Sequence, residues 1–373
     1  MEASYQVFRL LLVSGYYSIP VIRCRRNTIY LLSILSLVRL FIKKVFVFLL
    51  PILLLIVVSI GSFYYYDPFQ VLNPPSEFKE SIVGYNEEFV ATERYLRNPK
   101  NYGSFIFGSS RAGTGFRLED WATTLRKNDD LFLFASSNET IFGILGKIKL
   151  IEEVGGPLHD ALIIIDTDKT FHSYENSKGH IFIKHYRVSQ SDRSTFITTF
   201  LKDYIFSGFF IRFLDFKMFK TERPYMKGYL DITKLNSTKK YESFVGSYYL
   251  NQIIKKDSIK YYEDHQHLFY ERPKVAKVNP PMISERGISY LKTIKSIFDK
   301  KNTSYKFVIG PLYNQQKINA HDLQILRDIF GASHVYDYSG KNEFTENKGN
   351  YLEDSHYRPH VGAKILKDIY AEH

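Results

Sequence analysis

A serine that directly follows an apolar run is the first residue of this chain whose setting suggests chemistry. The segment Phe105–Gly113 reads FIFGSSRAG, so an apolar strand candidate ends at Gly108 and runs into a Gly-Ser-Ser turn. In an open α/β sheet, ligand sites form beyond the carboxyl ends of the strands. A serine such as Ser110 presents its hydroxyl there, and the backbone N–H groups that follow can stabilise an oxyanion. The alternative is a turn that only caps a helix.

A second polar segment, near the end of the chain, holds the other groups that serine chemistry needs. Residues 350–362 read NYLEDSHYRPHVG, so His356 follows Glu353 and Asp354 closely and precedes a helix expected from about Pro359. A nucleophilic serine needs a base that takes its proton and a carboxylate that orients the base. A carboxylate and a histidine on one loop meet the second need locally. Taken alone, the segment is typical of a polar loop with a helix cap.

Together the two segments resemble the SGNH (GDSL-type) hydrolase superfamily, whose nucleophilic serine follows the first strand and whose Asp-x-x-His lies close to the C-terminus. The resemblance is closest to membrane-anchored, cell-envelope members with a Gly-Ser-Ser-Arg first block and a His-Tyr-x-Pro last block. It covers about residues 100–370. It implies an α/β fold, a three-layer α/β/α sandwich with a parallel sheet, with Ser110 as the nucleophile and His356 as the general base.

The end blocks depart from the family pattern at two positions. Ser109 replaces the aspartate of Gly-Asp-Ser, which need not harm the nucleophile. Glu353 stands at the aspartate position of Asp-x-x-His, and Asp354 is displaced from it by one residue. Either carboxylate could orient His356, and the spacing favours Glu353.

The oxyanion hole is the part that the resemblance supports least. The second-block glycine, a backbone donor, corresponds to Ser137. The third-block asparagine has no clear counterpart, because Asp166-Thr167-Asp168 follows the third strand candidate and an ionised aspartate cannot donate. Asn138 and Asn314 are candidates to supply the missing amide donor.

Arg111 is expected either to pair with an anionic substrate group or to form an ion pair at the domain surface.

The elements that must position these groups alternate between short apolar runs and helical patterns. Strands are predicted at Phe105–Phe107, Leu131–Ala135, Ala161–Ile165, Tyr305–Ile309 and His334–Tyr336. Continuous rather than alternating apolar runs are typical of strands buried on both faces, which predicts a parallel sheet. Helices are predicted at Ile141–Glu153, Glu285–Lys301, His321–Phe330 and Pro359–Tyr370. This alternation predicts a doubly wound α/β sheet.

Residues 170–280 interrupt the alternation and are predicted to be an insertion over the sheet. The stretch is rich in Tyr, Phe, Lys and His and has no clear period, so it predicts either a lid or substrate-binding cap, or a set of irregular connections. Its Glu263–His267 segment, EDHQH, contains residue types that bind metals, but without a partner motif it is typical of a solvated loop. His172, His180 and His185 show no ligand spacing, and we expect neither a metal site nor a cofactor.

The excess positive charge is concentrated before an apolar segment. Residues 1–44 contain seven Lys or Arg residues and one acidic residue, so they account for +6 of the net +11. Val45–Tyr66 is uncharged over 22 residues, enough to span a bilayer, and Tyr64–Tyr66 suits the interface. Because Lys and Arg residues flank membrane spans on the cytoplasmic side, the basic segment predicts a cytoplasmic N-terminus and a C-terminal domain outside the membrane. The alternative is a cleaved signal peptide, although its apolar region would be shorter.

These features divide the chain and exclude several classes of protein. We expect a basic juxtamembrane segment (1–44), a transmembrane helix (45–66), a linker and lead-in (67–99) and the SGNH-like domain (100–373). A mean hydropathy of −0.22 excludes a polytopic membrane protein. Cys24 is the only cysteine, which excludes an intramolecular disulfide framework and a Cys-rich zinc site. Charge gathered beside a membrane span argues against a nucleic-acid binder.

Two functions follow as hypotheses. The first is a membrane-anchored serine esterase or O-acyltransferase that acts outside the cytoplasmic membrane, in a periplasm or at the cell surface, on acetyl or other acyl esters of an envelope polysaccharide. The resemblance implies a further partner, a multi-spanning membrane acyltransferase. The second is a catalytically inactive SGNH-like protein that binds a glycan or serves as a scaffold in envelope assembly.

Overall fold

The computed structural model describes residues 22–74, 83, 86–127, 130–171, 179–230, 245–275 and 277–371, with the backbone alone for residues 22–32 and 245–249. The chain divides into two compact units, Met1–Ser59 and Ile60–His373. Residues 1–21 of the basic segment, and His172, lie outside the described residues.

The first unit is dominated by one long apolar helix. Helix α1 covers Ile22–Tyr66, and its stretch Ser33–Tyr66 has a mean hydropathy of 2.8 over the most apolar window. At 1.5 Å per residue these 34 residues extend about 51 Å, well beyond the roughly 30 Å of a bilayer core. It is the one helix in the described part of the chain that is long and apolar enough to cross a membrane. Helix α1 begins before the expected span of residues 45–66, so it also contains residues 22–44 of the predicted basic segment.

A five-stranded, wholly parallel sheet forms the centre of the second unit, as predicted. Its strands are β1 (Ser104–Gly108), β2 (Leu131–Ala135), β3 (Asp160–Ile165), β4 (Ser304–Ile309) and β5 (Val335–Asp337). They lie in the order β2-β1-β3-β4-β5. Each of the five apolar runs became a strand, within a residue or two of the predicted bounds. The order changes direction at β1, and ligands of open α/β sheets typically bind beyond the carboxyl ends of the strands at such a point.

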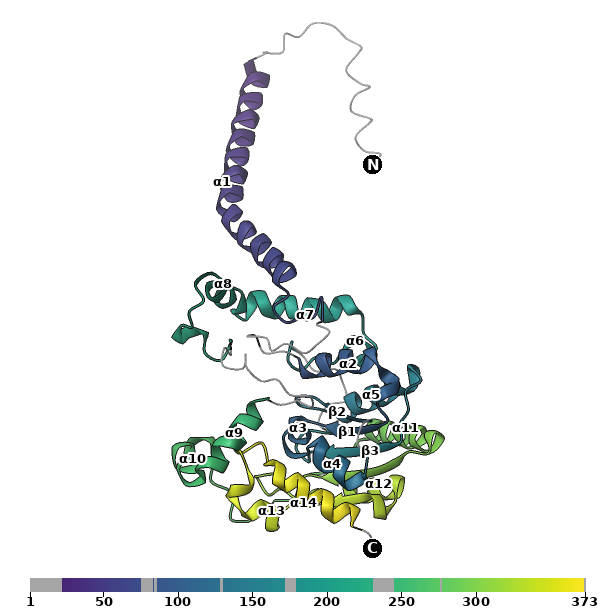
Figure 1. Ribbon diagram of the computed structural model, residues 1–373. Helices are drawn as coiled ribbons and strands as arrows, with labels where there is room; N and C mark the ends of the chain where they lie inside the picture. Colours follow the sequence, from purple (N-terminus) through teal and green to yellow (C-terminus); the bar gives the residue numbers. More distant parts are fainter. Residues whose placement is uncertain are drawn as a thin grey trace. The chain divides into compact units, whose positions relative to one another are not determined.

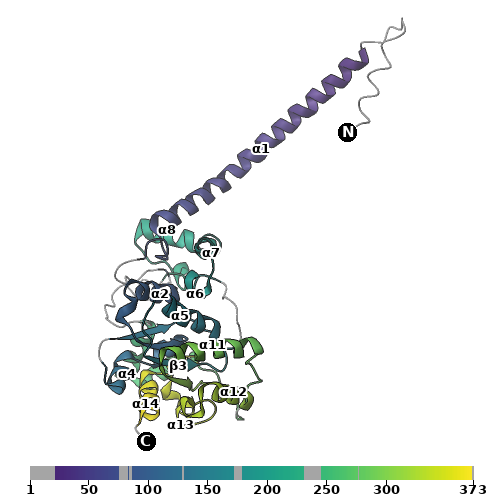
Figure 2. The ribbon, with the colours of Figure 1, turned by 90° about the vertical axis from the view of Figure 1, so that its right-hand side faces the viewer.

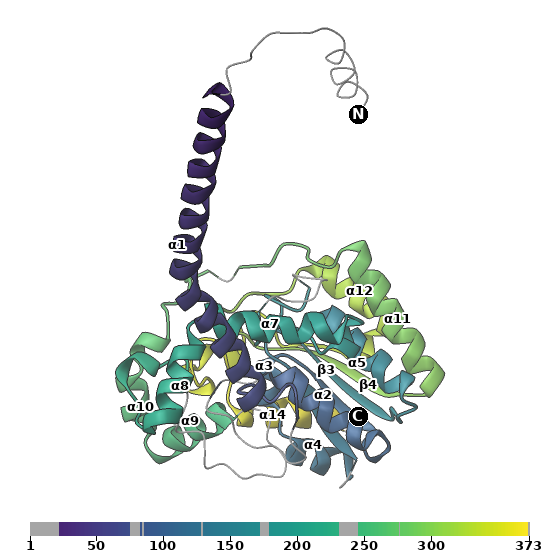
Figure 3. The same cartoon turned by 90° about the horizontal axis from the view of Figure 1, so that it is seen from above.

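Alternate strand residues enter two separate apolar clusters, each with its own group of helices. Figures 1 and 2 show the helices that surround the sheet. Phe105 and Phe107 belong to the first cluster, whereas Ile106 between them belongs to the second. The first includes residues of α5 (Ile141–Glu153), α11 (Glu285–Lys301) and α12 (Ala320–Phe330). Figure 3 shows these three helices beside one another. The second includes residues of α3 (Ser110–Gly115), α4 (Leu118–Leu125), α13 (Glu343–Glu346) and α14 (Pro359–Tyr370).

Local sequence explains where the predicted helices begin. The Thr140 side chain accepts a hydrogen bond from the Gly143 N–H and caps α5, and Ser284 caps α11 in the same way. Pro359 stands at the first position of α14, where its missing N–H costs nothing. The bounds of α5, α11 and α14 are those predicted, and α12 begins one residue earlier.

The lead-in and the insertion contain helices that the sequence did not predict. Helix α2 (Glu87–Arg97) lies within the expected linker and packs on β2. The insertion forms α6 (Tyr186–Ser189), α7 (Arg193–Phe206), α8 (Phe209–Phe219), α9 (Val245–Lys256) and α10 (Ser258–Asp264). Residues of α7 and α8 form a third apolar cluster that includes Phe63, Phe69 and Phe89.

Candidate active site

The nucleophile candidate stands at the junction of β1 and α3. Gly108 ends the strand, and a Cβ there would lie 2.7 Å from Ala112 Cβ, so glycine permits the tight turn. The Ser109 side chain accepts a hydrogen bond of 3.0 Å from the Arg111 N–H and caps α3. Ser110 is therefore the first residue of α3, and its own N–H has no acceptor within the helix.

A continuous series of side-chain contacts joins Ser110 to the C-terminal loop. The Nε2 of His356 lies 2.8 Å from the Ser110 hydroxyl oxygen. The Nδ1 of the same ring contacts Glu353 Oε1, and Glu353 Oε2 accepts a 2.6 Å hydrogen bond from the Ser355 N–H. With Nδ1 protonated toward Glu353, Nε2 is the acceptor for the serine proton. This is the relation of nucleophile, base and orienting acid that acyl transfer requires.

Glu353, rather than Asp354, is the carboxylate that contacts the histidine. Burial raises the pKa of Glu353, but the hydrogen bond and charge of His356 outweigh it and lower that pKa below its ordinary value. Burial and the Glu353 charge raise the pKa of Asp354. The Asp354 backbone N–H instead donates to the Leu268 carbonyl oxygen, at 3.1 Å, which ties the loop to the insertion.

Arg111 joins the two end blocks from within the protein. Its Nη1 and Nη2 donate to the two carboxylate oxygens of Asp168 at 2.6 and 3.1 Å, and its Nε donates to the Ser355 carbonyl oxygen at 2.7 Å. Nη1 also lies 3.3 Å from Asp166 Oδ2. Burial opposes the positive charge, but the Asp166 and Asp168 charges raise the pKa of Arg111 above its ordinary value. Of the two expectations for Arg111, the structure shows an ion pair, in a buried rather than a surface position.

Asp166 directly follows β3, in the segment where the sequence offers no clear counterpart of the third-block asparagine. Its side chain is buried, and Oδ2 accepts a hydrogen bond from the Ser109 hydroxyl. Within the described residues, Oδ1 and the buried Tyr357 hydroxyl have no hydrogen-bond partner. Burial raises the pKa of Asp166 despite the nearby Arg111. The sequence located this segment but did not predict that both Asp166 and Asp168 would pair with Arg111.

The three other oxyanion candidates make contacts away from the serine. Ser137 Oγ donates to Glu87 Oε2 at 2.9 Å, and Asn138, with a left-handed φ of 50°, accepts from Lys169 at 2.9 Å. The Asn314 amide lies 3.1 Å from Gln316 Oε1 within its own turn. Among the described hydrogen bonds, none joins these side chains to Ser110 or His356. The first two nevertheless lie on the loop after β2, which joins β1 through a 3.1 Å bond from the Ser136 N–H to the Gly108 carbonyl.

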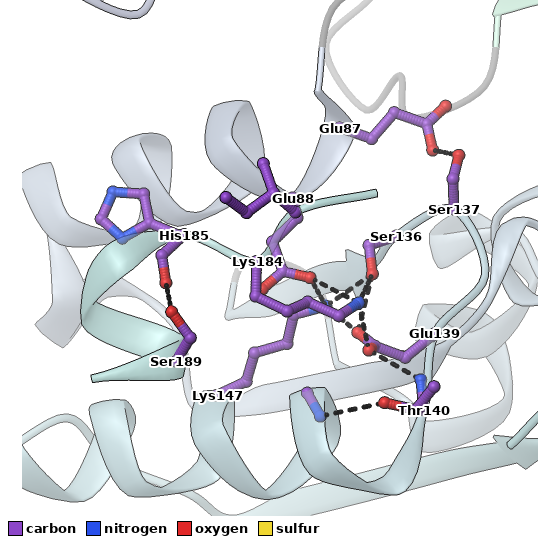
Figure 4. A network of polar contacts seen from close by, with 12 residues as sticks. Glu87, Glu88, Ser136, Ser137, Glu139, Thr140, Lys147, Lys184, His185 and Ser189 are labelled. Atoms are coloured by element: carbon purple, nitrogen blue, oxygen red, sulfur yellow. Dashed lines mark hydrogen bonds and ion pairs between the residues drawn. The ribbon is translucent and has the colours of Figure 1, made fainter. Parts of the chain in front are cut away.

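A cluster of four buried charges fixes the loop after β2. This ion cluster consists of Glu88, Glu139, Lys147 and Lys184, all with at most 2% of the side chain exposed (Figure 4). Lys184 Nζ lies 2.6 Å from Glu139 and 3.0 Å from Glu88, while Lys147 contacts Glu139 and lies 3.4 Å from Glu88. Ser136 Oγ donates to Glu139 at 2.8 Å. Two positive and two negative groups balance inside the protein.

The lysines decide the ionisation of the ion cluster. Burial raises the pKa of Glu139, but Lys147 and Lys184 outweigh it and lower that pKa to about 2. Burial likewise opposes the charge of Lys184, and the two glutamates raise its pKa. The sequence offered no signal for this cluster, because its members come from α2, the loop after β2, α5 and the segment before α6.

An open pocket of about 490 Å³ lies beside the C-terminal loop. Its walls combine aromatic rings with charged and amide groups: Tyr262, Glu263, Gln266, Phe269, Tyr270, Glu271, Tyr313 and Lys348. The Tyr262 hydroxyl donates to the Tyr351 carbonyl oxygen at 2.7 Å, and the Leu268 carbonyl accepts from Asp354. The pocket is therefore built against the loop that carries Glu353 and His356.

His180, His185 and His265, described histidines of the insertion, each contact a different residue. His180 Nδ1 is 2.7 Å from Asp203, His185 Nε2 is 3.0 Å from Glu93, and His265 stacks on Tyr261. In the described part of the chain, no three His, Cys, Asp or Glu side chains are grouped so that they could hold a metal ion.

No protein-family model matches the chain, and neither does any curated protein. What the site can do therefore has to be argued from its geometry.

Proposed function

We propose that this protein is a membrane-anchored, extracytoplasmic serine esterase or O-acyltransferase that acts on acyl esters, acetyl foremost, of a cell-envelope polysaccharide. The observation that carries the proposal is the contact series from Glu353 through His356 to Ser110, at the carboxyl end of β1. These groups come from opposite ends of the domain, 246 residues apart for the serine and histidine. A polar loop that only capped a helix would not need this arrangement.

The proposed reaction passes through an acyl-enzyme. Ser110 Oγ attacks the ester carbonyl carbon as its proton moves to His356 Nε2, and the Glu353 charge stabilises the imidazolium. The carbonyl–alkoxide bond then breaks, and the leaving oxygen takes the proton from His356. Water or a sugar hydroxyl next attacks the acyl carbon as its proton moves to His356 Nε2. The bond from Ser110 Oγ to the acyl group then breaks, and Ser110 Oγ takes that proton back from His356. Hydrolysis and transfer differ only in that final acceptor.

Backbone donors would bind the oxyanion. The Ser110 N–H is free of helical bonding by its position, and the resemblance adds the N–H of Ser137. Arg111 balances the carboxylates of Asp166 and Asp168, so that they repel the developing negative charge less.

Further features support the proposed fold, membrane orientation and substrate binding. The two apolar clusters, with helices on alternate strand faces, support the three-layer α/β/α sandwich. Basic residues before the apolar stretch of α1 support an N-terminus inside and a catalytic domain outside. Aromatic and polar walls in the pocket beside the loop suit the apolar faces and hydroxyls of a sugar. The multi-spanning acyltransferase partner rests on the resemblance alone.

A second candidate function is favoured by one observation. Asp166 and Asp168 follow β3, where the resemblance would place an amide donor, as in a protein of this fold that binds a glycan or serves as a scaffold without catalysis.

Acetate release distinguishes the two functions. The full chain in detergent is incubated with 4-nitrophenyl acetate and with acetylated xylan, alongside Ser110→Ala. An esterase releases nitrophenol and acetate, and the variant does not. An acyltransferase also consumes 4-nitrophenyl acetate, but it gives acetylated oligosaccharide when an acceptor is added. A folded wild-type chain that releases neither product favours the scaffold.

A further inference from the structure

Most of the exposed apolar side chains described in the second unit lie in two segments. Among its described residues, thirteen large apolar or aromatic side chains are exposed, and eight of these lie in 64–66 and 206–225. Of these eight, the most exposed are Tyr65 at 82%, Phe206 at 82% and Met218 at 72%. We call this set the α7–α8 patch, and it consists of Tyr64, Tyr65, Tyr66, Phe206, Ile211, Met218, Phe219 and Tyr225. Soluble surfaces rarely concentrate apolar side chains in this way.

The α7–α8 patch is fixed to the end of the apolar helix. The Tyr66 ring lies 5.6 Å from that of Phe213 on α8, and the Phe63 ring lies 5.7 Å from that of Tyr204 on α7. Ser62 Oγ and the Tyr204 hydroxyl are 3.1 Å apart. All of these residues belong to the second unit, and Tyr66 ends the apolar stretch of α1. Because residues 62–66 contact α7 and α8, these two helices would lie close to the bilayer surface where the apolar stretch leaves the membrane.

Helix α8 has the composition of an interfacial helix. Its Phe209, Phe210 and Phe213 are buried in the third apolar cluster, whereas Ile211 and Met218 face outward. Basic residues stand among the exposed apolar ones: Arg212, Lys217, Lys220 and Arg223. Apolar contact combined with basic charge is the pattern of helices that lie in the headgroup region of a membrane.

Cationic side chains are held close to aromatic rings on this segment. Lys217 Nζ lies 5.7 Å from the centre of the Tyr66 ring, and the Arg223 guanidinium lies 5.2 Å from that of Phe219. Burial and the nearby Lys220 lower the pKa of Lys217. Arg223 is paired with Asp215 at 2.8 Å, so the basic residues outnumber the acidic ones here, and anionic headgroups would supply further negative charge.

We propose that α8 and the end of α7 lie in the interface of the bilayer that α1 spans, with the α7–α8 patch against acyl chains and its basic residues at anionic headgroups. This inference rests on α1 crossing the membrane and is independent of the serine chemistry. It assigns the insertion two parts: α7 and α8 contact the membrane, and α10 lines the pocket.

Depth-dependent quenching of a single label tests the inference. The full chain with Cys24→Ser is labelled with NBD at Met218→Cys or Phe206→Cys and placed in nanodiscs that contain phosphatidylglycerol. Ile259→Cys on α10 is the matched control, because Ile259 is 73% exposed and Met218 is 72% exposed. Circular dichroism and Trp121 fluorescence establish that each labelled chain is folded.

We expect doxyl lipids to quench the labels at 206 and 218 several-fold more than the label at 259, and aqueous iodide to quench them several-fold less. Equal quenching at all three positions would overturn the inference. Protection from iodide without quenching by doxyl lipid would also overturn it, because a protein partner, rather than the bilayer, would then cover the patch.

Discussion

At the scale of single residues, the groups that contact His356 define the candidate site. The structure brings Ser110 and Glu353 to opposite nitrogens of its ring, whereas the Asp354 side chain contacts Glu353 and its backbone N–H donates to the insertion. Two adjacent carboxylates therefore have different roles, and substitutions can separate them.

Glu353→Gln should lower kcat by about 10²–10⁴-fold, because the amide keeps the size of the side chain but cannot stabilise a charged imidazole. Asp354→Asn is the matched control and should change kcat little. Steady-state hydrolysis of 4-nitrophenyl acetate measures both. Because the pKa of Glu353 is lowered, its contribution should persist just below pH 4.5 and be lost as the pH falls through the lowered value. Equal losses in both variants would contradict the assignment.

Tyr270 tests whether the pocket binds the glycan. Tyr270→Ala should raise KM for an acetylated oligosaccharide by about two- to tenfold, as expected from an aromatic contact worth about 0.5–1.5 kcal/mol, and should affect 4-nitrophenyl acetate much less. Tyr225→Ala is a suitable control, since both rings are 44% exposed and Tyr225 lies outside the pocket. A similar rise in KM in the control would remove the pocket from substrate binding.

At the scale of elements, the site depends on two contacts between segments that are distant in the sequence. Helix α3, which begins with Ser110, packs against α14, which follows the His356 loop. A Cβ on Gly362 would overlap the Gly115 carbonyl oxygen, and one on Gly115 would overlap the Tyr357 ring. The second contact is the ion cluster, which fixes the loop after β2.

Gly362→Ala should force α3 and α14 apart and lower the free energy of unfolding by about 1–3 kcal/mol. Gly310→Ala should cost less, because its nearest neighbour would be the Tyr357 hydroxyl at 3.5 Å, an ordinary contact. Thermal unfolding followed by circular dichroism compares the two. We also expect Gly362→Ala to lose esterase activity below its unfolding temperature, since the serine and histidine would no longer be in contact.

Lys184→Met should destabilise the domain by about 3–5 kcal/mol, because it leaves a buried negative charge without its partner. Lys341→Met removes an exposed pair with Glu346 and should cost at most about 1 kcal/mol. The pKa of Glu139 is lowered to about 2, so its contribution is present above pH 4.5 and lost as the pH falls toward 2. The Lys184→Met variant should therefore lose the stabilising contribution of Glu139 at a higher pH than the wild type does. Urea unfolding at pH 3 and pH 7 measures this, and identical profiles for variant and wild type would contradict it.

At the scale of the whole molecule, the parallel sheet was predictable because buried strands read as continuous apolar runs, as in Ala161–Ile165. Three helices kept their predicted bounds, and Thr140, Ser284 and Pro359 mark where they begin. Helix α2 was missed because it is polar, and α7 to α10 were missed because the insertion shows no clear apolar period. The spacing of the end blocks favoured Glu353 over Asp354, and Glu353 is the carboxylate that contacts His356.

The remaining parts of the site depend on contacts that sequence order does not reveal. The ion cluster draws on four segments, and the pairing of Arg111 with Asp166 and Asp168 joins two strand ends. The α7–α8 patch becomes visible only once burial separates Phe213 from Met218 on the same helix. Tertiary contacts between distant segments, rather than local secondary-structure propensity, determine each of these features.

The central claim is that Ser110 is activated by His356, and labelling with a fluorophosphonate probe tests it most directly. The detergent-solubilised full chain should be labelled at Ser110, and labelling should be lost in Ser110→Ala and His356→Ala while both variants remain folded by circular dichroism. A folded wild-type chain that is not labelled, or a His356→Ala chain labelled as fast as the wild type, would contradict the claim.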